Sequence, residues 1–169
     1  NGISKLEYSS YLCAALSYLM LQQRDSVGLV VFDQKIQKYI PPKSAATHLH
    51  VLLSELDKLQ ASQTTNVSSA LHEMADRIKR RGLIILLSDL FDYPEKIMSG
   101  LKHFRHRKHE VIVFHILDPR ERDFSFPQEA IFKDIETQEE ILTSPWQIQK
   151  DYQAKLQEWI EKYRLESRE

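Results

Sequence analysis

The sequence has only one cysteine and four glycines among its 169 residues, and it lacks any long apolar run. The lone Cys13 cannot build a disulfide framework, so we expect a reducing compartment, the cytoplasm. Its longest apolar runs, such as residues 83–87, are far below the ~18 residues that would suggest a membrane span. The net charge of −1 argues against an overall electrostatic attraction to nucleic acid. We therefore expect neither a nucleic-acid partner nor a membrane span in these residues.

The scarcity of glycine also excludes two common kinds of nucleotide site. A loop that cradles phosphate needs clustered glycines, so that backbone amides can approach the phosphate oxygens. Here Gly2, Gly28, Gly82 and Gly100 lie far apart, and neither GxGxxG nor GxxxxGK[ST] occurs. GxSxG and HExxH are absent as well, so the hydrolase signatures that they mark are missing.

The spacing of apolar residues predicts alternating helices and strands. Three nearly continuous apolar runs, at 27–32, 83–87 and 111–117, are typical of strands buried on both faces of a parallel sheet. Residues 36–40 alternate, follow the first run closely and stop at Pro41-Pro42, which predicts an antiparallel hairpin and an edge strand. The length suits one domain. We therefore predict an α/β fold: three layers, with a mostly parallel, doubly wound sheet and one antiparallel edge strand.

Helical spacing places the helices between and after these strands. Ser4 is the expected cap of a first helix that ends near Gln23, and Gly82 is the expected C-terminal cap of a third. The other predicted elements are helices at 49–59, 67–78 and 97–104, a small hairpin at 130–135 and 139–142, and a final helix from near Pro145.

Histidines and basic residues cluster at two predicted helix ends. His103, His106 and His109 form an HxxHxxH series, which could hold a metal ion, but flanking arginine and lysine residues oppose that. We favour a basic helix end, suited to the helix dipole, over a metal or nucleic-acid site. Residues 77–81 are interpreted in the same way.

Four further residues have a structural interpretation. Cys13 lies among apolar neighbours and is expected to pack rather than react. His115, inside an apolar strand, is expected to be a hydrogen-bonded core histidine. For Trp159 and Tyr163 we favour a place in the core over an interface.

Asp89 is the strongest candidate for a functional site. It ends a strand of the parallel type, and open α/β sheets bind ligands at the carboxyl ends of such strands. Asp92 follows three residues later, and the polar loop 64–66 can reach the same edge. Carboxylate and hydroxyl oxygens suit Mg²⁺. Helix capping by these side chains is an equally strong alternative.

Several motifs, in this order, resemble a bacterial family. They are Lys5-Leu6-Glu7-Tyr8, Asp25-Ser26-Val27-Gly28-Leu29-Val30-Val31-Phe32, Thr65-Asn66, Leu87-Ser88-Asp89 and His115-Ile116-Leu117-Asp118-Pro119. The family is the domain of unknown function numbered fifty-eight, whose core is similar to a von Willebrand factor A domain. The resemblance covers essentially the whole chain. It implies a metal-ion-dependent adhesion site at the carboxyl edge of the sheet.

The resemblance also implies the ligands of that metal. They come from a DxSxS segment, a threonine and an aspartate. Thr65 matches the threonine, since it begins the pattern T-[ND]-x-x-x-A-L, and Asp89 matches the aspartate. Thr65 and Asp89 are thus the expected metal ligands and Mg²⁺ the expected cofactor. No DxSxS occurs in these residues, so we expect Mg²⁺ binding by this chain to be weak or absent.

In the family, the DxSxS segment follows a first strand, and a further strand and helix follow a segment like 166–169. We therefore expect residues 1–169 to form a single von Willebrand factor A-like domain, truncated at both ends. The first strand would lie between the strands at Val27 and Leu83. Direct pairing of these two strands, pairing with a neighbouring molecule, or the rest of a longer protein would have to replace its hydrogen bonds.

Two functional classes follow. The resemblance implies a non-enzymatic protein–protein interaction module, in which a carboxylate of the partner completes the coordination of the metal. It further implies an adaptor for a MoxR-type AAA ATPase, and unpaired strands would allow an oligomer. The alternative is a Mg-dependent hydrolase or phosphoryl-transfer enzyme that uses Asp89 and Asp92. We favour the module, because the sequence shows no paired base, nucleophile or phosphate loop.

Overall fold

The computed structural model describes residues 2–60, 67–124, 130–133, 140–143 and 145–166. In chain order the elements are α1 (Lys5–Gln22), β1 (Val27–Phe32), β2 (Ile36–Lys43), α2 (His48–Leu56), α3 (Val67–Arg77), β3 (Leu83–Ser88), α4 (Pro94–His106), β4 (Glu110–His115), α5 (Pro119–Asp123), β5 (Ala130–Lys133), β6 (Glu140–Thr143) and α6 (Pro145–Glu166). This mixture of helices and strands agrees with the predicted α/β class.

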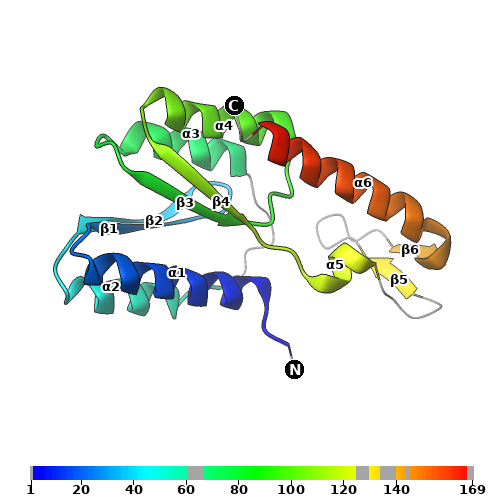
Figure 1. Ribbon diagram of the computed structural model, residues 1–169. Helices are drawn as coiled ribbons and strands as arrows, with labels where there is room; N and C mark the ends of the chain where they lie inside the picture. Colours follow the sequence, from blue (N-terminus) through cyan, green and yellow to red (C-terminus); the bar gives the residue numbers. More distant parts are fainter. Residues whose placement is uncertain (1, 61–66, 125–129, 134–139, 144, 167–169) are drawn as a thin grey trace.

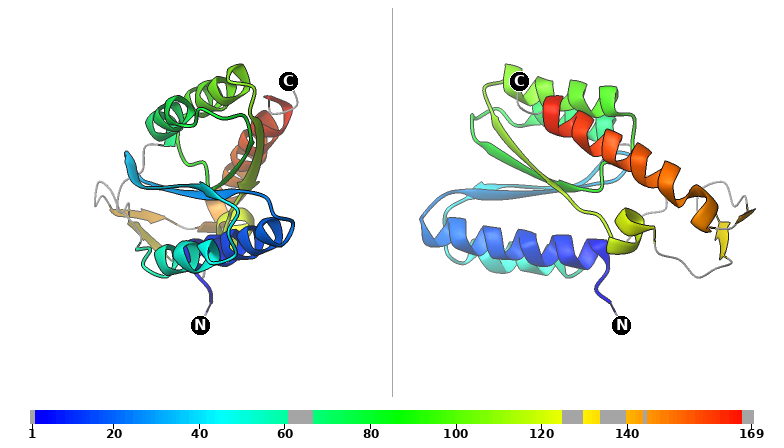
Figure 2. Two further views of the ribbon diagram at one scale, coloured as in Figure 1. Left: turned by 90° about the vertical axis from the view of Figure 1, so that its left-hand side faces the viewer. Right: turned by 45° about the vertical axis from the view of Figure 1, so that its right-hand side comes forward.

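Helices form two outer layers with strands between them (Figure 1). α1 and α2 lie side by side against the β1–β2 hairpin, and α3 and α4 lie side by side on the far side of β3 and β4 (Figures 1 and 2). α6 runs from the β5–β6 hairpin back to α4. The layers bring the first turn of α1 and the ends of β3 and β4 to the same end of the molecule.

The strands of the described residues form three two-stranded sheets, not the one continuous sheet that the sequence predicts. β1 and β2 pair antiparallel and β3 and β4 pair parallel, as expected, while β5 and β6 form the small hairpin. β1 and β3 are not paired with each other, and no described strand pairs with the second edge of either. Direct pairing of the Val27 and Leu83 strands is therefore wrong for this chain. Pairing through a neighbouring molecule or a longer protein stays a prediction.

Several predicted boundaries need correction. β2 continues through Pro41 and Pro42 to Lys43, which is possible because its pairing with β1 is irregular at the two prolines, between the pairs Leu29–Ile40 and Val27–Lys43, on a strand that lies at a sheet edge. α3 ends at Arg77, so Gly82 is not its cap. Instead the Gly82 carbonyl accepts a hydrogen bond from Glu110 N, at 3.1 Å, where β3 and β4 begin. The short helix α5 was not predicted from the sequence.

α1 begins where the sequence predicts. The Ser4 side chain accepts a hydrogen bond from Glu7 N, and the Glu7 carboxylate accepts one from Ser4 N at 2.8 Å, so the two residues form a capping box. This cap fixes the direction in which the first turn of α1 presents Lys5.

Two hydrophobic clusters hold the layers together. The larger joins α3, α4 and β3, and includes Leu71, Ile97 and Phe104, none of which is exposed. Tyr163 of α6 is buried in it and Trp159 packs against it, which confirms the predicted core role of both. The smaller cluster contains Leu21, Ile40 and Leu52 from α1, β2 and α2. Because isolated two-stranded sheets are marginal in water, these clusters must supply much of the stability.

Candidate functional site

The candidate site begins at the turn that follows β3. Asp89 leaves the carboxyl end of the strand, and Leu90 has a positive φ of 57°, which is unfavourable for a side chain of its size. Leu90 N donates to Ser88 Oγ at 3.0 Å, and Phe91 N donates to Asp89 Oδ1 at 3.4 Å. These bonds hold the Asp89 carboxylate at the edge of the β3–β4 sheet.

Two side chains, one buried and one half-buried, hold this turn through its carbonyl oxygens. His115 Nε2, at the end of β4, lies 2.9 Å from the Asp89 carbonyl oxygen, and Tyr163 Oη of α6 donates to the Leu90 carbonyl at 3.3 Å. A carbonyl can only accept, so the His115 proton is on Nε2. His115 is thus the hydrogen-bonded histidine that the sequence predicts. Burial lowers its pKa, so the ring is neutral at pH 7.

A lysine bridges two carboxylates at this edge. Lys5 Nζ lies 3.0 Å from Asp89 Oδ2 and 2.8 Å from Glu121 Oε1. Glu121 belongs to α5, where its other oxygen accepts from Asp118 N at 2.9 Å. The fold therefore directs two carboxylates, one from the turn after β3 and one from α5, at one cation. Partial burial acts to lower the pKa of Lys5, but the hydrogen bonds to Glu121 and Asp89 outweigh it and raise that pKa.

An aromatic side chain lies beside the bridged carboxylates. Lys5 Nζ lies 5.2 Å from the centre of the Phe91 ring, which stacks on Trp159 with ring centres 5.2 Å apart. Phe91 is half exposed, and Tyr93, two residues further, is 67% exposed. The charged centre of the site is thus bordered by solvent-accessible aromatic surface.

Asp92 has a structural role. Its Oδ1 accepts from Tyr93 N at 2.7 Å, and its Oδ2 lies 3.5 Å from Ser68 N, in the first turn of α3. The capping interpretation from the sequence is therefore confirmed for Asp92. Asp89, in contrast, is bound to a lysine and to the turn itself. Thr65, the other expected ligand, lies outside the described residues.

The three histidines of the HxxHxxH series do not lie on one helix. α4 ends at His106, and the positive φ of Lys108 turns the chain. His109 is buried and accepts a hydrogen bond from Gly82 N at 3.3 Å, so it is committed to the start of β3. Among the described residues, no group of three or more His, Cys, Asp or Glu side chains is arranged to hold a metal ion.

Sequence reasoning missed two members of the site, Lys5 and Glu121. A signal existed for Glu121, since it follows the carboxyl end of a predicted parallel strand within Asp118-Pro119-Arg120-Glu121. Lys5 had no such signal, because its contact with Asp89 depends on how α1 packs.

Cys13 is partly buried, and burial raises the pKa of its thiol, in keeping with the predicted packing role.

Among the helices in the described ranges, none has the length and apolar character needed to cross a bilayer.

Comparison with known proteins gives a family but no established activity. Uncharacterized proteins of Mycobacterium bovis and Mycobacterium tuberculosis are 22% identical to this chain over 127 residues. The match covers 73% of this chain and 39% of each relative, so this chain spans well under half of their length. No solved structure matches significantly. The profile of the family described as "Protein of unknown function DUF58" matches residues 2–161, and the chain therefore belongs to this family.

Proposed function

We propose that the chain is a non-enzymatic protein–protein interaction module whose recognition surface is the edge formed by Asp89 and Glu121. The observation that carries the proposal is the position of Lys5 Nζ, within 3.0 Å of both carboxylates. One carboxylate from the turn after β3 and one from α5 converge on one positive charge, beside the half-exposed ring of Phe91. Aromatic side chains beside a charged centre are typical of protein interfaces.

The same two carboxylates fit a divalent cation. Mg²⁺ prefers hard oxygen ligands and is commonly held by one or two carboxylates together with water. Asp89 and Glu121 would supply those oxygens, and Thr65 remains a proposed third ligand. With the ion bound, a carboxylate of the partner could complete its coordination, so recognition would depend on the metal. In the proposal the fold is von Willebrand factor A-like, with an additional strand between β1 and β3 that completes a doubly wound sheet.

Lys5 acts in this proposal as a built-in competitor of the divalent ion. Its ammonium group already occupies the space between the two carboxylates and balances one of their two negative charges, so a second cation must displace it. A half-exposed ion pair contributes up to about 1 kcal/mol, so the competition weakens divalent-ion binding by about fivefold. The site is therefore expected to bind Mg²⁺ weakly, in agreement with the missing DxSxS segment.

The expected partner is a protein that presents an acidic side chain. Phe91 and Tyr93 are large and exposed, and they follow Asp89 by two and four residues, so they would pack against the partner beside the ion. Through the family resemblance we propose a MoxR-type AAA ATPase, with this chain as its adaptor in the cytoplasm.

The first test is a Mn²⁺ titration followed by electron paramagnetic resonance. We expect weak, saturable binding by the parent chain, binding about fivefold tighter for Lys5→Met, and none for Asp89→Ala. Asp57→Ala is the matched control, because this exposed aspartate lies at the end of α2, away from the site. Absence of binding in both the parent chain and Lys5→Met would refute the metal-gated module.

The enzyme alternative makes a different prediction for Asp92. A Mg-dependent hydrolase or phosphoryl-transfer enzyme that uses Asp89 and Asp92 would turn over a phosphate ester, and each of Asp89→Ala and Asp92→Ala would abolish turnover. Because Asp92 already accepts hydrogen bonds from Tyr93 and Ser68, we expect no turnover. If the parent chain shows metal-dependent turnover and both variants lose it, the enzyme interpretation would be favoured over the interaction module.

A further inference from the structure

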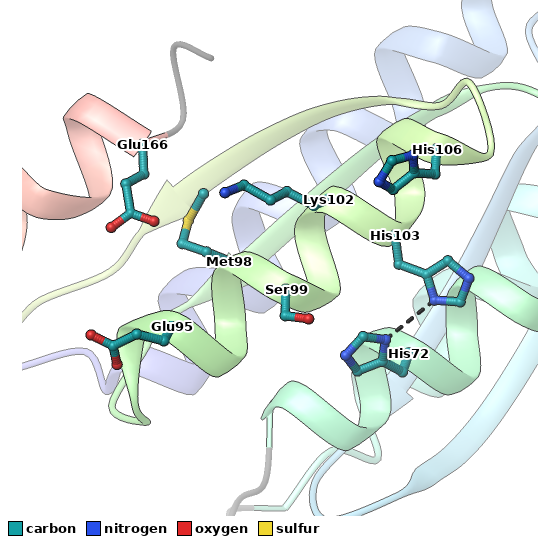
Figure 3. A pocket seen from close by; sticks show the side chains of 8 residues that line it. All are labelled: His72, Glu95, Met98, Ser99, Lys102, His103, His106 and Glu166. Atoms are coloured by element: carbon teal, nitrogen blue, oxygen red, sulfur yellow. Dashed lines mark hydrogen bonds between the residues drawn. The ribbon is translucent and has the colours of Figure 1, made fainter.

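A second group of titratable side chains lies on the α3–α4 layer. His72 of α3 and His103 of α4 face each other, with their Nδ1 atoms 3.2 Å apart (Figure 3). The rings are tilted by 44° with centres 5.4 Å apart, so they meet nitrogen to nitrogen and are not stacked. Neither residue takes part in the surface around Asp89.

We propose that His72 and His103 together bind a divalent transition-metal ion of the kind that prefers imidazole, such as Zn²⁺, Cu²⁺ or Ni²⁺. Two nitrogens that each lie 2.0–2.1 Å from a tetrahedral ion are about 3.3 Å apart. The Nδ1 atoms are already 3.2 Å apart, so both can coordinate one ion with little movement of either helix.

A carboxylate on the far side of His103 supports this arrangement. Asp76 Oδ1 lies 3.7 Å from His103 Nε2, and Arg107 holds the same oxygen at 2.6 Å. A negative charge there favours the proton on Nε2, which leaves a lone pair on His103 Nδ1 for the metal. Asp76 is thus a positioning residue for the site.

In the metal-free protein His72 Nδ1 then carries the proton and donates it to His103 Nδ1. When the ion binds, that proton leaves Nδ1 and His72 takes one up at Nε2 from solvent. The imidazole stays neutral, so no net proton is released. The exchange replaces one N–H···N hydrogen bond by two metal–nitrogen bonds.

An open pocket of about 530 Å³ gives water access to the remaining coordination positions. Its lining includes His72, His103, Lys102, Glu95 and Glu166 (Figure 3). Of the charged groups here, Glu95 is paired with Lys162, and Arg107 is paired with Asp76. Since no third His, Cys, Asp or Glu ligand converges here among the described side chains, water would complete the coordination. We therefore expect moderate affinity.

The test uses Zn²⁺ calorimetry together with Cu²⁺ electron paramagnetic resonance on the intact chain. We expect one equivalent of Zn²⁺, and a Cu²⁺ spectrum with superhyperfine splitting from two nitrogens. His72→Gln and His103→Gln should each weaken Zn²⁺ binding by at least about tenfold and remove one nitrogen from the splitting. His50→Gln is the matched control, because His50 is an exposed histidine on α2. Binding that survives His72→Gln, or no binding by the parent chain, would overturn the proposal.

A second variant addresses the positioning role and guards against simple loss of folding. Asp76 is 61% exposed, so Asp76→Asn should leave the far-ultraviolet circular dichroism spectrum unchanged. It should weaken Zn²⁺ binding by about tenfold while keeping the two-nitrogen Cu²⁺ spectrum. Unchanged affinity in this variant would refute the role of Asp76.

Discussion

Gly100 is the position at which a single methyl group should separate α3 from α4. A Cβ there would lie 2.7 Å from Leu71 Cβ and 3.1 Å from Leu71 Cδ1. Leu71 is completely buried, and its Cβ is attached directly to the backbone, so it cannot turn aside. Gly100→Ala therefore forces the two helices apart.

The expected cost follows from two opposing contributions. Alanine is favoured over glycine within a helix by about 1 kcal/mol. Overpacking a filled core costs about 1–3 kcal/mol, and here Ile97 and Phe104, both with no exposure, also lose contacts as the helices separate. We expect a net loss of about 1–2 kcal/mol in the free energy of unfolding. Since the same movement draws His72 away from His103, Zn²⁺ affinity should fall as well.

The measurement is urea unfolding followed by circular dichroism. Gly82→Ala is the matched control, because a Cβ at Gly82 meets nothing within 4 Å and its φ is not positive. That control should be neutral or more stable by about 0.4–1 kcal/mol. If Gly100→Ala proves as stable as Gly82→Ala, the close approach of the two helices described here is wrong.

Three further outcomes are expected. Phe104→Ala should cost about 3–5 kcal/mol in urea unfolding, because the ring is fully buried between α4 and its neighbours; a cost below about 1 kcal/mol would contradict that burial. Ser4→Ala should cost about 1 kcal/mol in the same assay through loss of the capping box, whereas Ser54→Ala, on the exposed side of α2, should be neutral or stabilising by up to about 0.7 kcal/mol. The pKa of His115 is lower in the folded chain than the ordinary value of 6.5, so below pH 6.5 the unfolded state binds more protons and stability falls as the pH falls. Urea midpoints measured from about pH 7.5 to about pH 5 should show this loss, and its slope should be smaller in His115→Gln; equal slopes would exclude His115 as a source.

Local signals predicted most of the elements correctly. The Ser4 cap, the apolar run at β3 and the helical spacing that ends α6 depend on neighbouring residues, and a sequence displays these directly. The β1–β2 hairpin was predictable because the two strands lie too close for a helical crossover. Errors arose where a neighbouring element decides the outcome. β2 continues past its prolines because its pairing with β1 is irregular there, and the Gly82 carbonyl accepts a hydrogen bond from β4 instead of capping α3.

The candidate site was predictable only in part. Asp89 was found because the end of a parallel strand is a general location for ligands. The ion pair that Asp89 makes could not be found this way, since Lys5 is 84 residues away in the sequence and Glu121 reaches the site through the unpredicted helix α5. The His72–His103 contact was missed for a similar reason, because it joins two helices whose packing follows from their buried faces.

By itself, the sequence determined the α/β class, the antiparallel hairpin, the place of Asp89 and the family, because periodicity, turn residues and motif order are properties of the chain. The tertiary structure alone decided which charges meet. It placed Lys5 between two carboxylates and directed the Asp92 carboxylate at the first turn of α3. It also brought the Nδ1 atoms of His72 and His103 within 3.2 Å of each other. It also left β1 and β3 not paired with each other. The physical reason is that hydrophobic burial fixes how the layers pack, and only that packing determines which distant polar groups become neighbours.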